Sequence, residues 1–216
     1  MIILFDLDGT LTDPKVGITK SVQYALAKMG ILVEDNEKLT PFIGPPLQQS
    51  FSEFYHFNEE EVQQAIVYYR ERFKDKGLFE NEVYPKIPKL LEKLKMQDHI
   101  LVVATSKPTI FAEEILSYFK LDHFFQFIIG SNLDGTRSSK GEIIEFVLNS
   151  IQENKLEDVV MIGDRKYDII GANQNGVPSI GVTYGYGTKE ELEEVNPTYI
   201  VNSVEDLENI LVQITK

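Results

Sequence analysis

Short apolar runs alternate with longer amphipathic stretches over most of this chain of 216 residues. The runs are residues 2–5, 100–104, 125–129, 159–162, 179–182 and 199–201. Runs of this length, bounded by polar residues, are typical of parallel strands that are buried on both faces. Apolar residues at helical spacing fill the stretches between them, which are residues 86–96 and those following Pro108, Lys140, Asp168 and Ser203. The alternation predicts right-handed β-α-β units and a Rossmann-like parallel sheet covered by helices.

The stretch from 15 to 80 interrupts this alternation directly after the first predicted strand. Residues 16–29 and 59–76 have the apolar spacing of helices, and each of these segments is followed by a glycine that suits a helix end. No part of the stretch has a strand pattern. The sequence therefore predicts an α/β core formed by residues 1–14 and 81–216, with an inserted α-helical cap domain at residues 15–80.

The composition is acidic and contains no cysteine. A formal net charge of −13 disfavours binding to nucleic acid polymers and to anionic membranes. The lack of cysteine excludes disulfides and thiolate metal sites. The apolar run at residues 2–5 is too short for a signal peptide, and no stretch reaches the ~18 apolar residues of a membrane helix. We therefore expect a cytoplasmic protein, in which an anionic substrate would need a local cation or a metal ion.

Polar side chains follow four of the predicted strands at the point where each strand ends. They are Asp6 and Asp8 after 2–5, Thr105, Ser106 and Lys107 after 100–104, Lys140 beyond 125–129, and Asp164 and Asp168 after 159–162. Ligands of open α/β sheets bind beyond the carboxyl ends of the strands. We therefore expect these side chains to meet at one edge of the sheet.

Carboxylates brought together in this way repel one another unless a cation lies between them. Mg²⁺ suits such a site, because it takes one or two carboxylates together with water and phosphate oxygens. Asp8 could offer its backbone carbonyl to the metal, which would leave its side chain for proton transfer. The Thr105 hydroxyl, nearby backbone amides and the Lys140 ammonium group could hold a phosphate dianion.

Each of these features also has a common structural explanation when it is taken alone. An Asp-Gly pair occurs in tight turns, Thr105 and Ser106 could cap a helix, and Lys140 could be a solvated surface lysine. A calcium-binding loop does not fit, because its twelfth position would be Gly17 instead of a glutamate. The glycines at 185 and 187 do not form a phosphate-binding fingerprint, and we expect a loop flanking the site. The conjunction at successive strand ends favours a functional site.

At this point the sequence resembles the haloacid dehalogenase superfamily. Residues 6–10 (DLDGT) resemble its first motif, Thr105 its second, Lys140 its third, and residues 163–168 (GDRKYD) its fourth. The insertion after the first motif is similar to the helical cap of the phosphoglycolate phosphatase-like branch. Segments that also resemble members described as 5′-nucleotidases are 104–108 (ATSKP), 133–137 (LDGTR) and 163–165 (GDR).

The resemblance implies a phosphatase that works through a phosphorylated aspartate. It implies that Asp6 is the nucleophile and that Asp8 protonates the leaving oxygen and then activates water. It also implies that Asp6, the Asp8 carbonyl and Asp164 hold Mg²⁺, with Asp168 outside the direct ligands. The inserted cap would exclude water and recognise the leaving group.

The same resemblance assigns phosphate binding to Thr105, Ser106 and Lys140. Lys107 and Arg165 adjoin motif residues and are candidate substrate contacts, with solvent exposure as the alternative. The expected partner is a small phosphorylated substrate, first a nucleoside 5′-monophosphate and second phosphoglycolate or a sugar phosphate.

Other activities share parts of this pattern. Dehalogenases of the superfamily lack the second aspartate of the first motif, so Asp8 argues against that reaction. A phosphomutase would use the same phosphorylated aspartate and return the phosphoryl group to a sugar. A signalling receiver domain also combines aspartates, Mg²⁺, a threonine and a lysine, but the DLDGT spacing and the insertion disfavour it. A binding protein without turnover is the remaining alternative, and measured turnover distinguishes it.

Overall fold

The computed structural model describes residues 1–151 and 156–214. The chain forms two compact units. The core unit consists of Met1–Asp13 and Val83–Lys216, and the insert unit is Pro14–Glu82. The core unit alternates strands and helices around a parallel sheet, whereas the insert unit is mainly helical. The predicted fold class is therefore confirmed.

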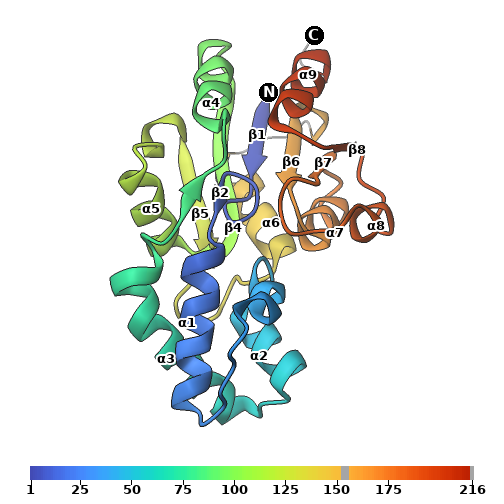
Figure 1. Cartoon of the computed structure of the whole chain (residues 1–216). Coiled ribbons are helices and arrows are strands. Elements are labelled where there is room, and N and C mark those ends of the chain that lie inside the picture. Colours follow the sequence, from blue (N-terminus) through green and yellow to red (C-terminus); the bar gives the residue numbers. More distant parts are fainter. Residues whose placement is uncertain (152–155, 215–216) are drawn as a thin grey trace. The chain divides into compact units, whose positions relative to one another are not determined.

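The core unit is built on the six-stranded sheet of Figure 1. In spatial order its strands are β5 (Phe127–Ser131), β4 (Ile100–Pro108), β1 (Ile2–Phe5), β6 (Val159–Gly163), β7 (Ser179–Val182) and β8 (Tyr199–Val201). All adjacent pairs are parallel. Phe5 at the end of β1 is level with Val103 of β4 and Ile162 of β6. The residues that follow these three central strands therefore lie at the same edge of the sheet.

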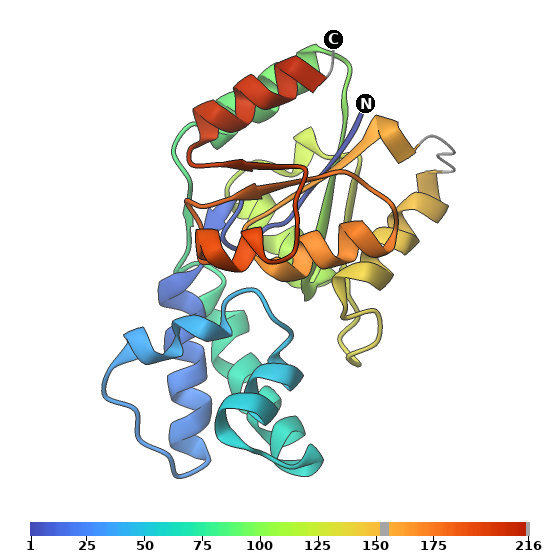
Figure 2. The ribbon, with the colours of Figure 1, turned by 90° about the vertical axis from the view of Figure 1, so that its right-hand side faces the viewer.

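Helices cover both faces of this sheet, as Figure 2 shows. Side chains of β1 alternate between the faces, and Ile2 and Leu4 pack in a cluster with Ile143 and Val147. Ile3 is fully buried on the opposite face. Each buried aliphatic side chain stabilises the fold by about 1.5–3 kcal/mol, which supports so short a central strand. The helices of the core unit are α4 (Ile87–Met96), α5 (Thr109–Tyr118), η3 (Asp122–Phe124), α6 (Lys140–Ile151), η4 (Leu156–Asp158), α7 (Lys166–Gln174), α8 (Lys189–Glu193) and α9 (Val204–Ile214).

Several strand boundaries differ from the sequence prediction, and β5 and β6 end at Ser131 and Gly163 instead of residues 129 and 162. β4 continues past the predicted end at residue 104, because its pairing with β5 resumes at Pro108 after an irregularity. Residues 105–107 therefore belong to the strand and not to a loop that follows it. β5 begins at Phe127, two residues later than predicted, and the Phe125 N–H instead bonds back to the Asp122 carbonyl oxygen of the 3₁₀ turn η3 at 3.1 Å.

The start of α7 also differs from the prediction. The helix begins at Lys166, so Asp168 lies in its first turn instead of before it. The Arg165 N–H donates to Asp168 Oδ2 at 3.1 Å, which satisfies one of the amide groups left without a helical partner at a helix start. The carboxylate that belongs to the fourth motif therefore also stabilises the helix that carries it.

The insert unit consists of short helices around an aromatic and aliphatic core. They are α1 (Lys15–Lys28), the 3₁₀ helix η1 (Asn36–Phe42), α2 (Leu47–Tyr55), α3 (Glu59–Arg72) and the π-helical turn η2 (Phe73–Gly77). Asn58 caps α3 in a reciprocal capping box with Glu61. α1 and η2 come so close that a Cβ on Gly17 would lie 2.1 Å from the Gly77 carbonyl oxygen.

Two further observations complete the fold. The segments β2 (Thr12–Asp13) and β3 (Glu82–Val83) pair as a two-stranded sheet. Among the described residues, no helix combines the length and the apolar character needed to cross a bilayer.

Candidate active site

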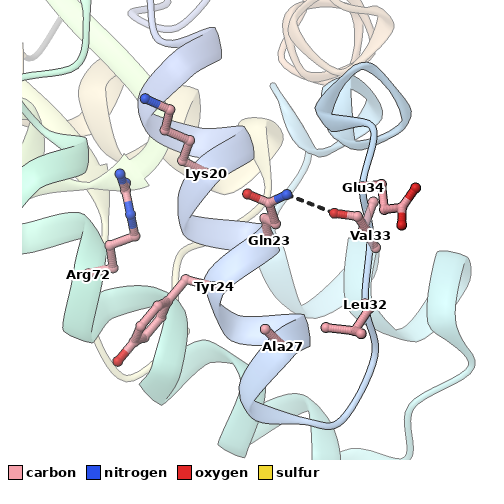
Figure 3. A pocket seen from close by; sticks show the side chains of 8 residues that line it. All are labelled: Lys20, Gln23, Tyr24, Ala27, Leu32, Val33, Glu34 and Arg72. Atoms are coloured by element: carbon pink, nitrogen blue, oxygen red, sulfur yellow. Dashed lines mark hydrogen bonds between the residues drawn. The ribbon is translucent and has the colours of Figure 1, made fainter.

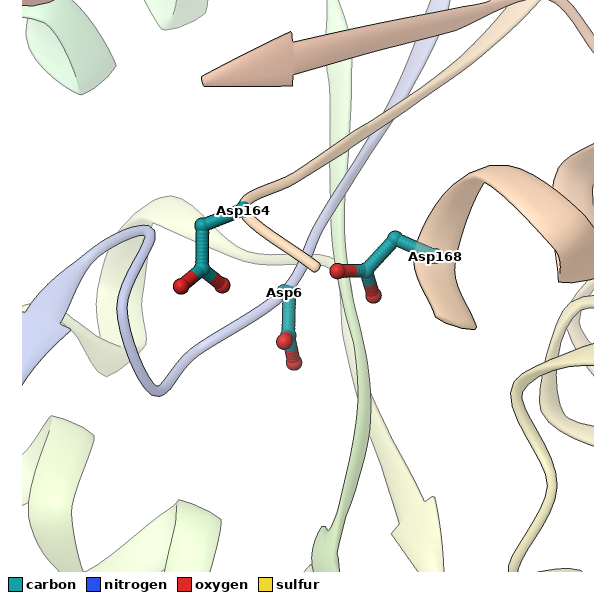
Figure 4. Close-up of side chains that lie close together, drawn as sticks. All are labelled: Asp6, Asp164 and Asp168. Carbon is teal, nitrogen blue, oxygen red and sulfur yellow. The ribbon is translucent and has the colours of Figure 1, made fainter. Parts of the chain in front are cut away.

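Three carboxylates converge at the carboxyl edge of the central strands (Figure 4). Asp6 follows β1, Asp164 follows β6, and Asp168 lies in the first turn of α7. One oxygen from each residue lies within 4.8 Å of the others, and all three residues are buried. Burial, together with the negative charges of Asp168 and Asp6, raises the pKa of Asp164 well above its usual value. The cluster therefore has the geometry of a cation site.

Lys140 joins this cluster from the first residue of α6. Its Nζ lies 2.8 Å from Asp6 Oδ1 and 2.7 Å from Asp168 Oδ1, and it donates to the Ala104 carbonyl oxygen at 2.9 Å. Burial alone would lower the pKa of Lys140, but Asp168 and Asp6 outweigh that effect and raise it. Burial raises the pKa of Asp168 to about 6, against the opposing charge of Lys140. The ammonium group therefore stays charged beside Asp6.

Asp8 forms a second buried ion pair at the same edge. Its Oδ2 lies 2.8 Å from Lys107 Nζ, and each of the two residues is 8% exposed. Within residues 1–151 and 156–214, Asp8 Oδ1 is a buried carboxylate oxygen without a hydrogen-bond partner. Burial raises the pKa of Asp8 despite the lowering effect of Lys107. Solvent exposure, the alternative considered for Lys107, is therefore wrong.

Of the two candidate phosphate-binding hydroxyls, Thr105 is the more enclosed. Thr105 is 2% exposed, and its Oγ1 accepts from the Lys107 N–H at 3.3 Å. Ser106 is half-buried, and its backbone carbonyl oxygen accepts from Ser131 Oγ at 2.9 Å. Both residues lie in the irregular part of β4. The strand therefore presents one buried hydroxyl at the same edge of the sheet as the carboxylates.

A glycine-rich loop after β7 packs against Asp164, as the sequence predicts for a loop flanking the site. The Tyr186 N–H donates to Asp164 Oδ2 at 2.7 Å. A Cβ on Gly185 would lie 2.4 Å from Asp164 Cβ, and one on Gly187 would lie 1.9 Å from the Asp164 carbonyl oxygen. A Cβ on Gly9, at φ +83°, would lie 2.1 Å from Asp164 Oδ2. These glycines let the main chain approach where a side chain would collide with the carboxyl group or the main chain of Asp164.

The same loop contributes tyrosines that sequence reasoning missed. The Tyr186 hydroxyl donates to Asp13 Oδ1, and the Tyr184 hydroxyl donates to the Thr10 carbonyl oxygen at 3.1 Å. Tyr184 also meets Tyr84 edge to face, with ring centroids 5.2 Å apart. Burial raises the pKa of both Tyr184 and Tyr186, so the phenols remain protonated donors. The signal in the sequence was the repeated Tyr-Gly pattern at 184–187.

Arg165 is held by an acidic partner on α8. Its Nε lies 2.9 Å from Glu191 Oε1, and its side chain is 13% exposed. Glu191 Oε1 also accepts from the Lys166 N–H at 3.0 Å, so it ties the start of α7 to α8. The Arg165 side chain is therefore mostly buried and engaged with α8, and solvent exposure is wrong for this residue as well.

The charges at this edge do not balance without a further cation. The groups involved are the carboxylates and ammonium groups of Asp6, Asp8, Asp164, Asp168, Lys107 and Lys140. Four carboxylates against two ammonium groups leave a formal surplus of two negative charges. Oxygen donors of this kind suit hard divalent cations such as Mg²⁺. The residues present therefore fit a divalent metal ion.

The insert unit has a pocket of its own, of about 520 Å³ (Figure 3). Lys20 and Arg72 line it, but Glu80 lies 3.4 Å from Lys20 Nζ and 2.8 Å from Arg72 Nη1, so both cations are already compensated. In the described part of the chain, the group of three acidic side chains suited to a metal is the one in the core unit. The candidate chemistry is therefore concentrated at the edge of the sheet.

Known proteins resemble this chain over nearly its whole length. The family model described as haloacid dehalogenase-like hydrolase matches residues 3–182. The chain is 50% identical over 209 residues to a 5′-nucleotidase of Pseudomonas aeruginosa, covering 97% of this chain and 94% of that protein. It is 33% identical over 202 residues to the tyrosine-protein kinase PtkA of Mycobacterium tuberculosis, covering 94% of this chain and 68% of that protein. The crystal structure of a predicted phosphatase from Clostridium acetobutylicum matches with a TM-score of 0.96 and 53% identity, over 98% of both chains.

Proposed function

This chain belongs to the haloacid dehalogenase-like hydrolase family and is a phosphatase, and we propose that it hydrolyses small phosphomonoesters through a phosphorylated Asp6. In this proposal Mg²⁺ is the cofactor and a nucleoside 5′-monophosphate is the first candidate substrate. The observation that carries the proposal is the convergence of Asp6, Asp164, Asp168 and Lys140 at one buried edge of the sheet.

The contacts of Asp6 favour one of its oxygens as the nucleophile. The Leu7 N–H and Lys140 Nζ both bond to Oδ1, each at 2.8 Å. We therefore expect Oδ2 to attack the phosphorus atom, with Oδ1 held in place by its two donors. Lys140 stays charged beside the reacting group and offsets negative charge that develops on the phosphoryl oxygens.

The residues proposed to hold Mg²⁺ are Asp6, Asp164 and the backbone carbonyl of Asp8. An ion bound there would supply positive charge that offsets the negative charge of the phosphoryl group. Asp168 contacts Lys140, and its proposed role is to position that lysine from outside the direct ligand set. The proposed role of Thr105 and Ser106 is to donate hydrogen bonds to the phosphoryl oxygens.

Two proton transfers by Asp8 complete the proposed reaction. As Asp6 Oδ2 bonds to phosphorus, the bond from phosphorus to the leaving oxygen breaks, and Asp8 gives that oxygen its proton. Asp8, now ionised, then takes a proton from water as the water oxygen attacks the phosphorus atom. The bond from phosphorus to Asp6 breaks, which releases inorganic phosphate and regenerates the free carboxylate.

The substrate proposal is supported by the relative named 5′-nucleotidase, which is 50% identical over nearly the whole chain. We expect a phosphate-release screen over phosphorylated metabolites to give the highest kcat/KM with a nucleoside 5′-monophosphate. Phosphoglycolate and sugar phosphates are the second candidates, and a phosphomutase would instead return the phosphoryl group to a sugar. A flat low response to nucleotides with a sharp peak elsewhere would reverse this ranking.

The same screen separates hydrolysis from phosphoryl transfer to protein. Because one relative is named a tyrosine-protein kinase, a parallel incubation with ATP should follow protein-bound phosphate. Hydrolysis predicts sustained release of inorganic phosphate over many turnovers. Near-stoichiometric labelling of the chain without release would favour a receiver-like role, and labelled tyrosine on a protein substrate would favour a kinase.

Removal of divalent metal should stop phosphate release, and added Mg²⁺ should restore it. The physical reason is the surplus of two negative charges at the site, which opposes the approach of an anionic phosphate. The measurement is the initial rate after treatment with excess chelator, followed by titration with Mg²⁺. A second readout is the unfolding temperature, which should rise with Mg²⁺ because the folded state binds it. Full activity in excess chelator would contradict the metal proposal.

A further inference from the structure

We propose that Lys107 is a positioning residue for Asp8, which holds Asp8 Oδ2 so that Oδ1 is directed toward the leaving oxygen of the substrate. This inference rests on the proposed function, because it concerns the proton transfer attributed to Asp8. Lys107 lies outside the four motif positions that the sequence matches, and its contacts in the structure are what assign it this role.

The two oxygens of Asp8 have different surroundings. Lys107 Nζ contacts Oδ2 at 2.8 Å, with side chains that are 5% and 11% exposed. In the described residues, Oδ1 is buried without a hydrogen-bond partner. A buried carboxylate oxygen left without a donor is costly, so an oxygen of this kind at a functional site calls for a ligand. The leaving oxygen of a bound phosphomonoester would supply that partner when Asp8 carries the proton.

The main chain around Lys107 is fixed on two sides. Its N–H donates to Thr105 Oγ1 at 3.3 Å, within the irregular part of β4. On the other side, β5 approaches so closely that a Cβ on Gly130 would lie 2.1 Å from the Lys107 carbonyl oxygen. A lysine held in this way starts from a fixed Cα, so no further main-chain freedom has to be lost when its ammonium group binds Asp8.

The ion pair of Lys107 with Asp8 also favours transfer of the proton from Asp8 to the leaving oxygen. Asp8 donates its proton to the leaving oxygen while the bond from phosphorus to that oxygen breaks, and a buried carboxylate is left behind. Lys107 Nζ, at 2.8 Å from Asp8 Oδ2, stabilises that carboxylate through a charge-assisted hydrogen bond. Its contribution should therefore be largest for substrates whose leaving oxygen needs protonation.

This dependence on the leaving group gives a sharp test with Lys107→Met. For a nucleoside 5′-monophosphate, whose alkoxide is a poor leaving group, kcat/KM should fall by about 10²-fold or more. For p-nitrophenyl phosphate, whose phenolate leaves without protonation, kcat/KM should stay within about threefold of the wild-type value. The ratio kcat/KM is the proper readout, because it reports the steps up to the departure of the first product.

Two further variants complete the test. Lys107→Gln replaces the ammonium group with a neutral polar amide on a slightly shorter side chain, and it should show the same selective loss if the methionine variant does not fold. Lys93→Met removes a surface ion pair with Glu208 on α4 and α9 and should leave both rates unchanged. An equal loss for both substrates, as expected of a phosphate-binding or purely structural lysine, would overturn the proposal, and so would no loss for either.

The wild-type protein and Asp6→Asn separate this inference from the proposed function. If the wild-type protein releases no phosphate, or Asp6→Asn retains full turnover, the proposed function itself has failed. If wild-type turnover and its loss in Asp6→Asn are both observed, the comparison of the two substrates bears on Lys107 alone.

Discussion

Asp6→Asn should abolish phosphate release while the fold is kept. The asparagine Oδ1 can still accept hydrogen bonds from the Leu7 N–H and from Lys140, so the local geometry survives. Its amide nitrogen cannot replace the attacking carboxylate oxygen. We therefore expect kcat to fall by about 10⁴–10⁶-fold, the range found when a covalent nucleophile is removed. The measurement is phosphate release from the best substrate and from p-nitrophenyl phosphate.

A matched control for this variant is Asp75→Asn, an exposed aspartate in η2 of the insert unit. Its activity should equal that of the wild-type protein. Circular dichroism and thermal unfolding should show that Asp6→Asn remains folded. Normal turnover by the folded Asp6→Asn variant would refute the nucleophile assignment, whichever substrate is used.

Lys140→Met should impair both activity and stability. The ammonium group contacts Asp6, Asp168 and the Ala104 carbonyl oxygen, and its removal leaves two buried carboxylates without their cation. Breaking a buried ion pair from one side typically destabilises a protein by about 3–5 kcal/mol. Loss of a preorganised positive group at the phosphoryl oxygens should lower kcat by about 10²–10³-fold. Urea unfolding and steady-state kinetics measure the two effects.

Added Mg²⁺ should separate the two effects of this variant. A bound cation offsets part of the uncompensated negative charge, so it should recover some of the lost stability. It cannot replace the ammonium group at its own position, so the activity should remain low. Lys93→Met, which removes a surface pair, should cost less than about 1 kcal/mol. A Lys140→Met variant with wild-type stability and turnover would contradict the arrangement described.

The carboxylate cluster was predictable because it depends on strand ends and not on details of packing. In a parallel sheet, residues that follow level strands meet at one edge, and Phe5 is indeed level with Ile162. That rule places Asp6 near Asp164 without knowledge of any side chain. The family resemblance was also confirmed, since the matching family model covers residues 3–182.

The partner of Asp8 was not predictable in the same way. Lys107 lies in β4, and alternation along a regular strand gives no reason for its side chain to reach Asp8. The irregular register between Ala104 and Pro108 changes that alternation, and it arises from pairing with β5. Such an irregularity depends on tertiary contacts, so a single sequence does not reveal it.

Two further features were not predicted from the sequence, for a related reason. They are the hydrogen bond of Tyr186 to Asp13 and the existence of helix α2. Tyr186 contacts Asp13 across 173 positions of sequence, and no local pattern encodes a pairing of that range. α2 spans only nine residues, Leu47–Tyr55, and follows two prolines that mark a loop. Its burial comes from ring contacts such as that of Phe51 with Phe42, at 5.0 Å between centroids, and not from helix propensity.

The strand order has a consequence for how durable the catalytic geometry is. β1 hydrogen-bonds to β4 on one side and to β6 on the other, so the strands that deliver the reactive carboxylates are the innermost of the sheet. Interior strands open last when a protein fluctuates, because their exchange with solvent requires global unfolding. Fraying of the peripheral β5 or β8 edges should therefore leave the reactive groups in register. Inactivation by heat or denaturant should then coincide with collapse of the whole sheet, without an earlier loss confined to the site.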